Sequence, residues 1–123
     1  AAALYVGLNI LLLIFLAYRV VARRGSARVS VGTGDDKQLE LRVRAHGNAS
    51  EYIPPMLIGL VLAAFMNFPV WSIHVLGSIF TLGRVLHVIG LTRTVMPARV
   101  MGIVFSWVPM GILAFALIYF AFV

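Results

Sequence analysis

Four long apolar runs divide the chain, and shorter polar segments separate them. The runs cover residues 1–21, 42–65, 70–91 and 100–123, with charged residues at the start of the second. Because about 20 apolar residues suffice for a helix to cross a bilayer, each run is long enough to span a membrane. The pattern predicts one domain with an all-α fold, an integral membrane four-helix bundle. We expect its helices at about 3–22, 38–66, 70–91 and 99–122.

The connections between the runs also carry signals. Gly25, Gly32 and Gly34 are expected to keep the segment after the first run out of a helix. Asp36 is suited to cap the second helix, because its carboxylate can accept hydrogen bonds from backbone N–H groups of the first turn. The Asn67–Pro69 segment is a very short turn, so the second and third helices should be antiparallel neighbours.

A polar face interrupts the second run. Arg44, Asn48 and Glu51 recur at i, i+4 and i+7, so they share one face of a helix. Glu51 lies about 15 Å into that helix at 1.5 Å per residue, which places it within the hydrocarbon layer. Ionisable groups at that depth are costly, so a functional site is the first hypothesis for this face. Pro54 and Pro55 follow, and they predict a kink.

One polar residue and one set of small residues suggest contacts between helices. Asn9 is the one strongly polar residue inside the first run, and we expect it to make an interhelical hydrogen bond. The third run contains small residues that would allow close helix packing, namely Gly77, Thr81, Gly83 and Gly90.

Composition supports the membrane interpretation. Hydrophobic residues make up 62% of the chain and charged residues only 11%, whereas a soluble domain carries about 25% charged residues. There is no cysteine, which excludes a thiolate metal site and a cysteine nucleophile, and the three histidines do not have metal-ligand spacing. The net charge of +6 comes from arginines at the ends of apolar runs, so we expect no nucleic-acid partner.

The positions of the basic residues predict a topology. Positive charge gathers between the first and second runs and between the third and fourth. The positive-inside rule then places both basic loops in the cytoplasm and both termini on the other side. Arg84 and His87 in the third run would therefore lie at the same end of the bundle as Arg44, Asn48 and Arg99. Four short helices enclose little space, so we expect a homo-oligomer with a site between copies.

Two motifs resemble a known family. The segment RAHGNASEYIP covers Arg44–Pro54, and GRVLH covers Gly83–His87. These motifs resemble the MAPEG family, the membrane-associated proteins of eicosanoid and glutathione metabolism, and in particular its small members of the bacterial inner membrane. The matching positions are Arg44, His46, Asn48, Glu51, Pro55, Gly83, Arg84, His87 and Arg99.

The resemblance implies a homotrimer that binds glutathione as co-substrate between adjacent subunits, open to the cytoplasmic side. The positions that match glutathione contacts are Arg44, Asn48, Glu51, Tyr52, His87 and Arg99. It also implies a transferase or peroxidase acting on hydrophobic electrophiles. Arg99, and Arg24 or a neighbour in the Arg23–Arg28 cluster, match catalytic positions.

The chemistry of these residue types suits glutathione. Guanidinium groups bind carboxylates with paired hydrogen bonds, and Glu51 can receive the ammonium group. Asn48 can serve the peptide amides as donor and acceptor. An arginine near the sulfur favours the thiolate, which is the nucleophile. The hydrophobic second substrate would enter from the bilayer between the first and fourth helices.

Departures from the family pattern leave alternatives open. Leu91 stands where the eicosanoid-metabolising members usually carry a tyrosine, and Val100 and Ile103 stand where some members carry hydroxyl residues. These departures favour a second hypothesis, a catalytically silent structural or accessory subunit of a larger membrane complex. A small transporter or sensor is a lesser alternative, disfavoured because the sequence has no internal repeat. Glu51 could also form only a buried ion pair with Arg44 or Arg84, and we expect Arg84 to be its structural partner.

Overall fold

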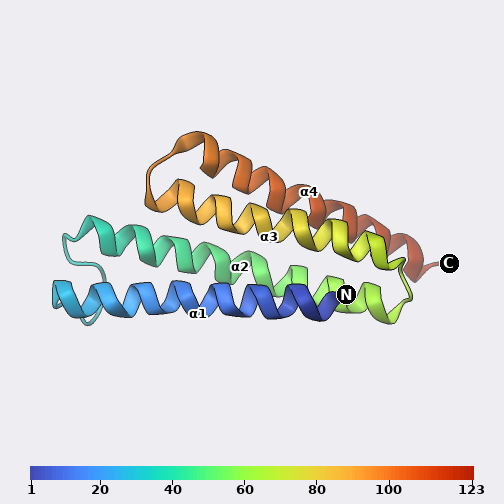
Figure 1. The fold of residues 1–123 in the computed structure, drawn as a ribbon, viewed down its shortest axis with the longest axis horizontal. Helices are drawn as coiled ribbons and strands as arrows, with labels where there is room; N and C mark the ends of the chain where they lie inside the picture. Colours follow the sequence, from blue (N-terminus) through green and yellow to red (C-terminus); the bar gives the residue numbers. More distant parts are fainter.

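Four helices make up the fold, and no strand is present. The computed structural model describes residues 1–123, with α1 at Ala2–Ala27, α2 at Lys37–Phe65, α3 at Val70–Thr92 and α4 at Met96–Ala121. All four helices are long and apolar enough to cross a membrane. Figure 1 shows them lying lengthwise beside one another, with α1 along one edge and α4 along the other. The prediction of an all-α membrane protein with four spans is confirmed.

The first helix is longer than the sequence suggested. It continues through Gly25 and ends at Ala27, where Arg28 adopts a left-handed backbone with φ of 58°. A single glycine costs a helix only about 1 kcal/mol, so it does not by itself end one. Gly32 and Gly34 do lie in the loop, with φ of 69° and 55°. The charged end of α1 therefore extends beyond the predicted boundary near residue 22.

The start of α2 follows the prediction. Asp36 is the N-cap, and its carboxylate accepts a hydrogen bond of 2.8 Å from the backbone N–H of Leu39. The same carboxylate forms an ion pair with Arg23 on α1, at 2.8 Å between Oδ2 and Nη2. The hydrogen bond from Arg23, and then the one from Leu39, hold the pKa of the Asp36 carboxyl below its ordinary value. One acidic residue thus caps α2 and joins it to α1.

The turn between α2 and α3 has a well-defined geometry. Asn67 adopts the left-handed conformation with φ of 58°. Its N–H bonds to the carbonyl of Ala64, and the N–H of Phe68 bonds to that of Ala63. This pair of bonds is the usual way in which a helix ends at a left-handed residue. It reverses the chain at once, so α2 and α3 are antiparallel neighbours as predicted.

The packing of α3 against α4 depends on glycines. A Cβ atom on Gly83 or Gly90 would collide with the backbone of α4, and one on Gly102 would collide with the backbone of His87 on α3. The two helix backbones are therefore in direct contact at these positions, as the small residues of α3 predicted. This contact places Arg99 beside Gly90 and brings the polar side chains of both helices together.

A second set of polar contacts joins α1 to α3. The hydroxyl of Tyr5 lies 2.7 Å from Nδ1 of His74 and 3.0 Å from Oγ of Ser78. Asn9 is fully buried, and its Nδ2 donates to Oγ1 of Thr81 at 2.9 Å. The predicted interhelical role of Asn9 is confirmed.

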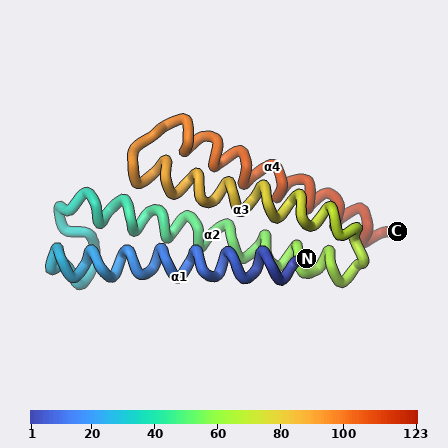
Figure 2. The backbone as a smooth tube through the Cα atoms, in the orientation of Figure 1, coloured from blue at the N-terminus to red at the C-terminus, as the bar shows by residue number.

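Helices α1 and α4 do not touch each other within one chain. Figure 2 shows their backbones at opposite edges of the bundle, with α2 and α3 between them. A substrate entrance between the first and fourth helices, as the sequence suggested, therefore does not exist within a single chain. It would need helices from two copies.

Candidate functional site

A buried arginine lies at the centre of the polar residues. Arg84 is only 1% exposed. Its Nη2 donates a very short hydrogen bond to Oδ1 of Asn48 and lies 3.2 Å from Nδ1 of His87, and its Nη1 donates to Oγ of Ser106 at 3.3 Å. No carboxylate forms an ion pair with it, and its Nε has no partner. The side chains that contact this cation include no acidic group.

The sequence explains how these groups meet. Arg84 and His87 are three residues apart on α3, so they share a face. Ser106 on α4 donates to the carbonyl of Gly102 at 2.7 Å, which leaves its oxygen free to accept from Arg84. The ring of Tyr52 on α2 lies 5.4 Å from the guanidinium carbon. One cation therefore joins α2, α3 and α4.

Glu51 has a different position from the one expected. Its side chain is exposed, and it makes no hydrogen bond or ion pair within the chain. The predicted pairing of Glu51 with Arg84 or Arg44 is therefore wrong. Asn48 supplies the acceptor for Arg84 instead, because Glu51 lies about 60° further round the helix. Glu51 is left as an exposed carboxylate on a membrane-spanning helix.

A cleft brings two of the predicted site residues together. It has a volume of about 250 Å³ and lies where α2, the end of α3 and the start of α4 meet. Arg44 and Arg99 both line it, and neither side chain forms a hydrogen bond or ion pair within the chain. Its other lining residues are Lys37, Leu41, Gly90, Leu91, Thr94 and Met96. The cleft carries three basic side chains and no acidic one.

The charges in and near the cleft indicate which kind of ligand would suit it. Unpaired guanidinium groups form paired, charge-assisted hydrogen bonds with carboxylates. Glu51 follows Arg44 by seven residues on the same face of α2, about 10 Å further along the helix axis. A tripeptide has an extended length of about 10 Å. Glu51 lies outside the lining of the cleft, so only a ligand that extends beyond it along α2, such as a small peptide with carboxylates and one amino group, could contact all three residues.

The other predicted site residues, Asn48 and Glu51 among them, do not line this cleft. His87 is 3% exposed and lies between Arg84 and the backbone of Gly102. Tyr52 is half-buried beside Arg84. Arg24 donates to the carbonyl of Gly32 at 2.6 Å, and it lies on α1, which has no contact with α4. Arg24 and Arg99 are therefore not brought together within one chain.

Sequence reasoning missed two residues of the site. Ser106 is fully buried against Arg84, although the sequence suggested nothing more than a polar interruption in an apolar helix. Its spacing of four from Gly102 is the small-residue pattern of membrane helix contacts, and it was the available signal. Lys37 lines the cleft together with Arg44, which follows it by about two turns on the same face of α2. Its position at the very start of a helix gave no sign of this.

The fold and the site together define an integral membrane protein with four spanning helices, a buried arginine without an ion-pair partner at its centre, and a basic cleft at one end. The family model described as "MAPEG family" matches residues 2–119. The chain belongs to the MAPEG family.

The chain is also 36% identical over 109 residues to "Inner membrane protein YecN" from two strains of Escherichia coli. The matched region covers 86% of this chain and 81% of that protein. Together with the four apolar helices, this relative supports placing the chain in an inner membrane. No solved structure matches.

Proposed function

We propose that this protein binds glutathione and acts as a glutathione transferase or peroxidase on hydrophobic electrophiles. The observation that supports this most directly is the set of three charges without partners: Arg44, Arg99 and Glu51. Glutathione has two carboxylates and one ammonium group. The charges of these three side chains are thus the complement of those of the tripeptide.

Each residue has a proposed role. Arg44 and Arg99 bind the carboxylates, and Glu51 receives the ammonium group. Asn48 offers only its Nδ2 to the peptide, because its oxygen already accepts from Arg84. Tyr52 and His87 contact Arg84, so within one chain they would act by holding Asn48 in place.

The proposed reaction needs no nucleophile from the protein. A cation near the sulfur, Arg99 or Arg24 from a neighbouring copy, favours loss of the thiol proton. The thiolate then attacks the electrophilic carbon and forms a carbon–sulfur bond. With a chlorinated aromatic, chloride leaves with the bonding electron pair, and the products are the conjugate, chloride and a proton. As a peroxidase, two glutathione molecules would give up two electrons to a hydroperoxide and yield the disulfide, an alcohol and water.

We further propose that the functional unit is a homotrimer with glutathione between subunits. The exposure of Glu51 supports this, since an unpaired carboxylate on a spanning helix needs a polar partner from outside the chain. The separation of α1 from α4 supports it as well. A hydrophobic substrate would reach the site between α1 of one copy and α4 of the next.

Calorimetry in detergent tests the binding step. Glutathione should bind the natural protein, and Glu51→Gln and Arg44→Ala should each weaken binding by about tenfold or more. Ser50→Ala is the matched control, because Ser50 is exposed on α2 and its hydroxyl bonds only to its own helix. Absence of binding by the natural protein, or equal loss in the control, would contradict the proposed site.

A conjugation assay with chlorodinitrobenzene tests the enzyme separately. A rate above the uncatalysed background that is lost in Arg44→Ala and Glu51→Gln would support catalysis. Glutathione binding without any rate above background would end the enzyme proposal and leave the binding site intact.

One observation favours the second candidate, a catalytically silent structural or accessory subunit of a larger membrane complex. Leu91 lines the cleft where many family members would present a tyrosine hydroxyl. A cleft without that donor is poorer at stabilising a thiolate. Reproducible copurification with other membrane subunits, together with no binding of glutathione, would favour this candidate.

A further inference from the structure

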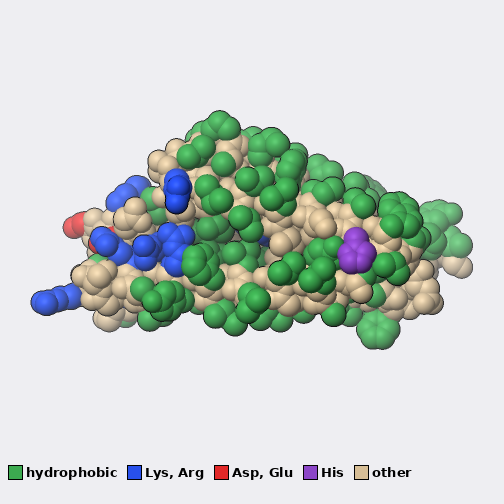
Figure 3. Space-filling view, in the orientation of Figure 1, with side chains coloured by type: hydrophobic (Ala, Val, Ile, Leu, Met, Phe, Trp, Pro, Cys, Tyr) green, Lys and Arg blue, Asp and Glu red, His purple; other side chains and the backbone are tan.

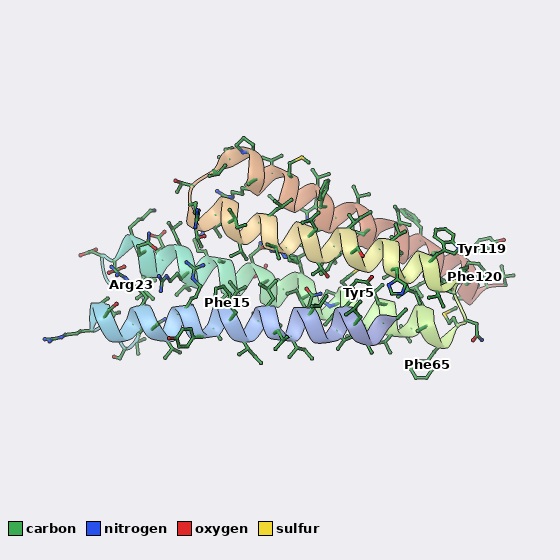
Figure 4. All side chains as sticks on the ribbon, in the orientation of Figure 1. Tyr5, Phe15, Arg23, Phe65, Tyr119 and Phe120 are labelled. Atoms are coloured by element: carbon green, nitrogen blue, oxygen red, sulfur yellow. The ribbon has the colours of Figure 1, made fainter.

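A second depression lies between α1 and α3, and it shares no lining residue with the Arg44–Arg99 cleft. Its volume of about 410 Å³ is within the range of small-molecule sites. Much of its wall is apolar, formed by Leu12 and Phe15 on α1 and by Val85, Val88 and Ile89 on α3. Figure 4 shows Phe15 partway along α1, with Arg23 nearer the charged end of the helix. We refer to this depression as the α1–α3 groove.

One end of the α1–α3 groove is polar. Arg19 from α1 and Arg93 from the end of α3 both line it. The guanidinium of Arg19 lies 5.9 Å from the centre of the Phe15 ring, so the basic end adjoins the apolar wall directly. Arg42 on α2 donates from Nη1 to the carbonyl of Arg19 at 2.9 Å, which brings a third arginine to the same end.

No acidic side chain compensates these three arginines. The two ion pairs of the chain are Arg23–Asp36 and Lys37–Glu40, so neither includes Arg19, Arg42 or Arg93. Arg42, through its bond to the Arg19 carbonyl, and Arg93, through the shared groove, lie near enough to Arg19 for like charges to repel. Arg42 also has a buried Nε without any hydrogen-bond partner. Figure 3 shows the Lys and Arg side chains gathered at this end of the molecule, beside an otherwise apolar surface.

Three uncompensated arginines beside an apolar groove could bind a membrane molecule that has both an anionic group and an apolar chain. Guanidinium groups bind phosphate with paired hydrogen bonds. Basic pockets between spanning helices are typical sites for anionic lipid headgroups. A free inorganic anion would satisfy the arginines but would leave the apolar wall unused. An anionic phospholipid satisfies both parts at once.

We propose that the α1–α3 groove binds one anionic phospholipid from the leaflet next to the basic end. Its phosphate contacts Arg19 and Arg93, with Arg42 adding positive charge, and an acyl chain lies along Phe15 and Val85. Binding removes the repulsion among the arginines and joins α1 to α3 at the end of the bundle where these helices are furthest from their Tyr5 contacts.

Native mass spectrometry of the full chain, stripped of lipid in an uncharged detergent, tests this proposal. Dioleoyl phosphatidylglycerol should bind at one molecule per chain and at least about fivefold more tightly than dioleoyl phosphatidylcholine. Inorganic phosphate should not displace it at equal concentration. Equal retention of the two lipids, or displacement by phosphate alone, would overturn the assignment of an anionic lipid.

Variants locate the site. Arg19→Gln and Arg93→Gln should each weaken phosphatidylglycerol binding by about fivefold. Arg28→Gln is the charge-matched control, because Arg28 is exposed and makes no side-chain hydrogen bond or ion pair. A loss in the control as large as in Arg93→Gln would show a general effect of surface charge and would contradict a defined groove.

A steric pair tests the apolar part of the groove. Val85→Trp fills it and should reduce binding of the lipid. Val104→Trp is the control, since Val104 is a similarly exposed valine, 44% against 39%, on α4 and away from the groove. Unchanged binding in Val85→Trp, in a protein that keeps its melting temperature, would overturn the placement of the acyl chain.

Discussion

The backbone of Gly102 on α4 lies directly against the backbone of His87 on α3, closer than any Cβ atom at position 102 would permit. This contact is one turn from Ser106, whose hydroxyl reaches Arg84. The distance between two helix axes is therefore set at the level of the polar centre. Glycines at this contact maintain the geometry on which the hydrogen bonds of Arg84 depend.

The first prediction concerns that contact. Gly102→Ala should lower stability by about 1–3 kcal/mol, because α3 and α4 must separate to admit the methyl group. Gly111→Ala on the same helix is the control, since no atom lies within 4 Å of its Cβ position. Alanine favours a helix over glycine by about 1 kcal/mol, so the control should be neutral or stabilising. Thermal unfolding in detergent measures both, and effects of the same sign would contradict the prediction.

The second prediction concerns the buried cation. Asn48→Ala should destabilise the protein by about 1–3 kcal/mol, because Arg84 loses a charge-assisted acceptor while remaining buried. Asn48→Asp restores an acceptor at the same place and should recover most of this loss. Melting temperatures of the two variants and of Ser50→Ala provide the measurement. An equal decrease in Asn48→Asp and Asn48→Ala would show that the contact with Arg84 contributes little.

The third prediction concerns pH and the Asp36–Arg23 pair. Because the pKa of Asp36 is lowered in the folded protein, its contribution to stability is fully present above the unfolded value of about 4. The contribution is lost as pH falls through the folded pKa. Asp36→Asn keeps a capping side chain and removes the charge. The difference in melting temperature between the two proteins should therefore be greatest near pH 7 and should shrink below pH of about 4. A difference independent of pH would contradict this.

The fourth prediction concerns the missing hydroxyl of the cleft. Leu91→Tyr should raise the glutathione conjugation rate by about tenfold, since a positioned donor to an anion can contribute about 10²-fold. Leu82→Tyr is the control, because Leu82 is an exposed leucine on the same helix outside the cleft. Assays at saturating glutathione measure the effect. If a folded Leu91→Tyr protein binds glutathione but shows no higher rate, the absence of a tyrosine hydroxyl is not what limits catalysis.

Much of the fold was predictable from the sequence. Asp36 caps α2 and Asn67 turns the chain because both effects depend on local backbone geometry. Gly83 and Gly90 were expected to allow a close helix contact, because small residues let two backbones approach, but the sequence did not identify α4 as the partner. The end of α1 was not predicted, because a single glycine costs a helix only about 1 kcal/mol and the neighbouring arginines are good helix formers.

The candidate site was less predictable. The spacing of Arg44, Asn48 and Glu51 shows that they share a face, and it says nothing about which neighbouring helix meets each of them. Asn48 bonds to Arg84, whereas Glu51 makes no hydrogen bond or ion pair within the chain, because the two side chains lie about 60° apart around α2. Ser106 contacts Arg84 because α3 packs against α4. Local sequence patterns do not show which helices pack together, so this contact could not be predicted.

The even number of helices returns the chain to the side from which it started. Figure 1 shows both termini toward the end of the molecule opposite the basic loops. Affinity tags or fluorescent reporters attached at either terminus would consequently report on the same compartment. They would also leave the basic end, with the cleft and the groove, uncovered for ligands during purification and titration.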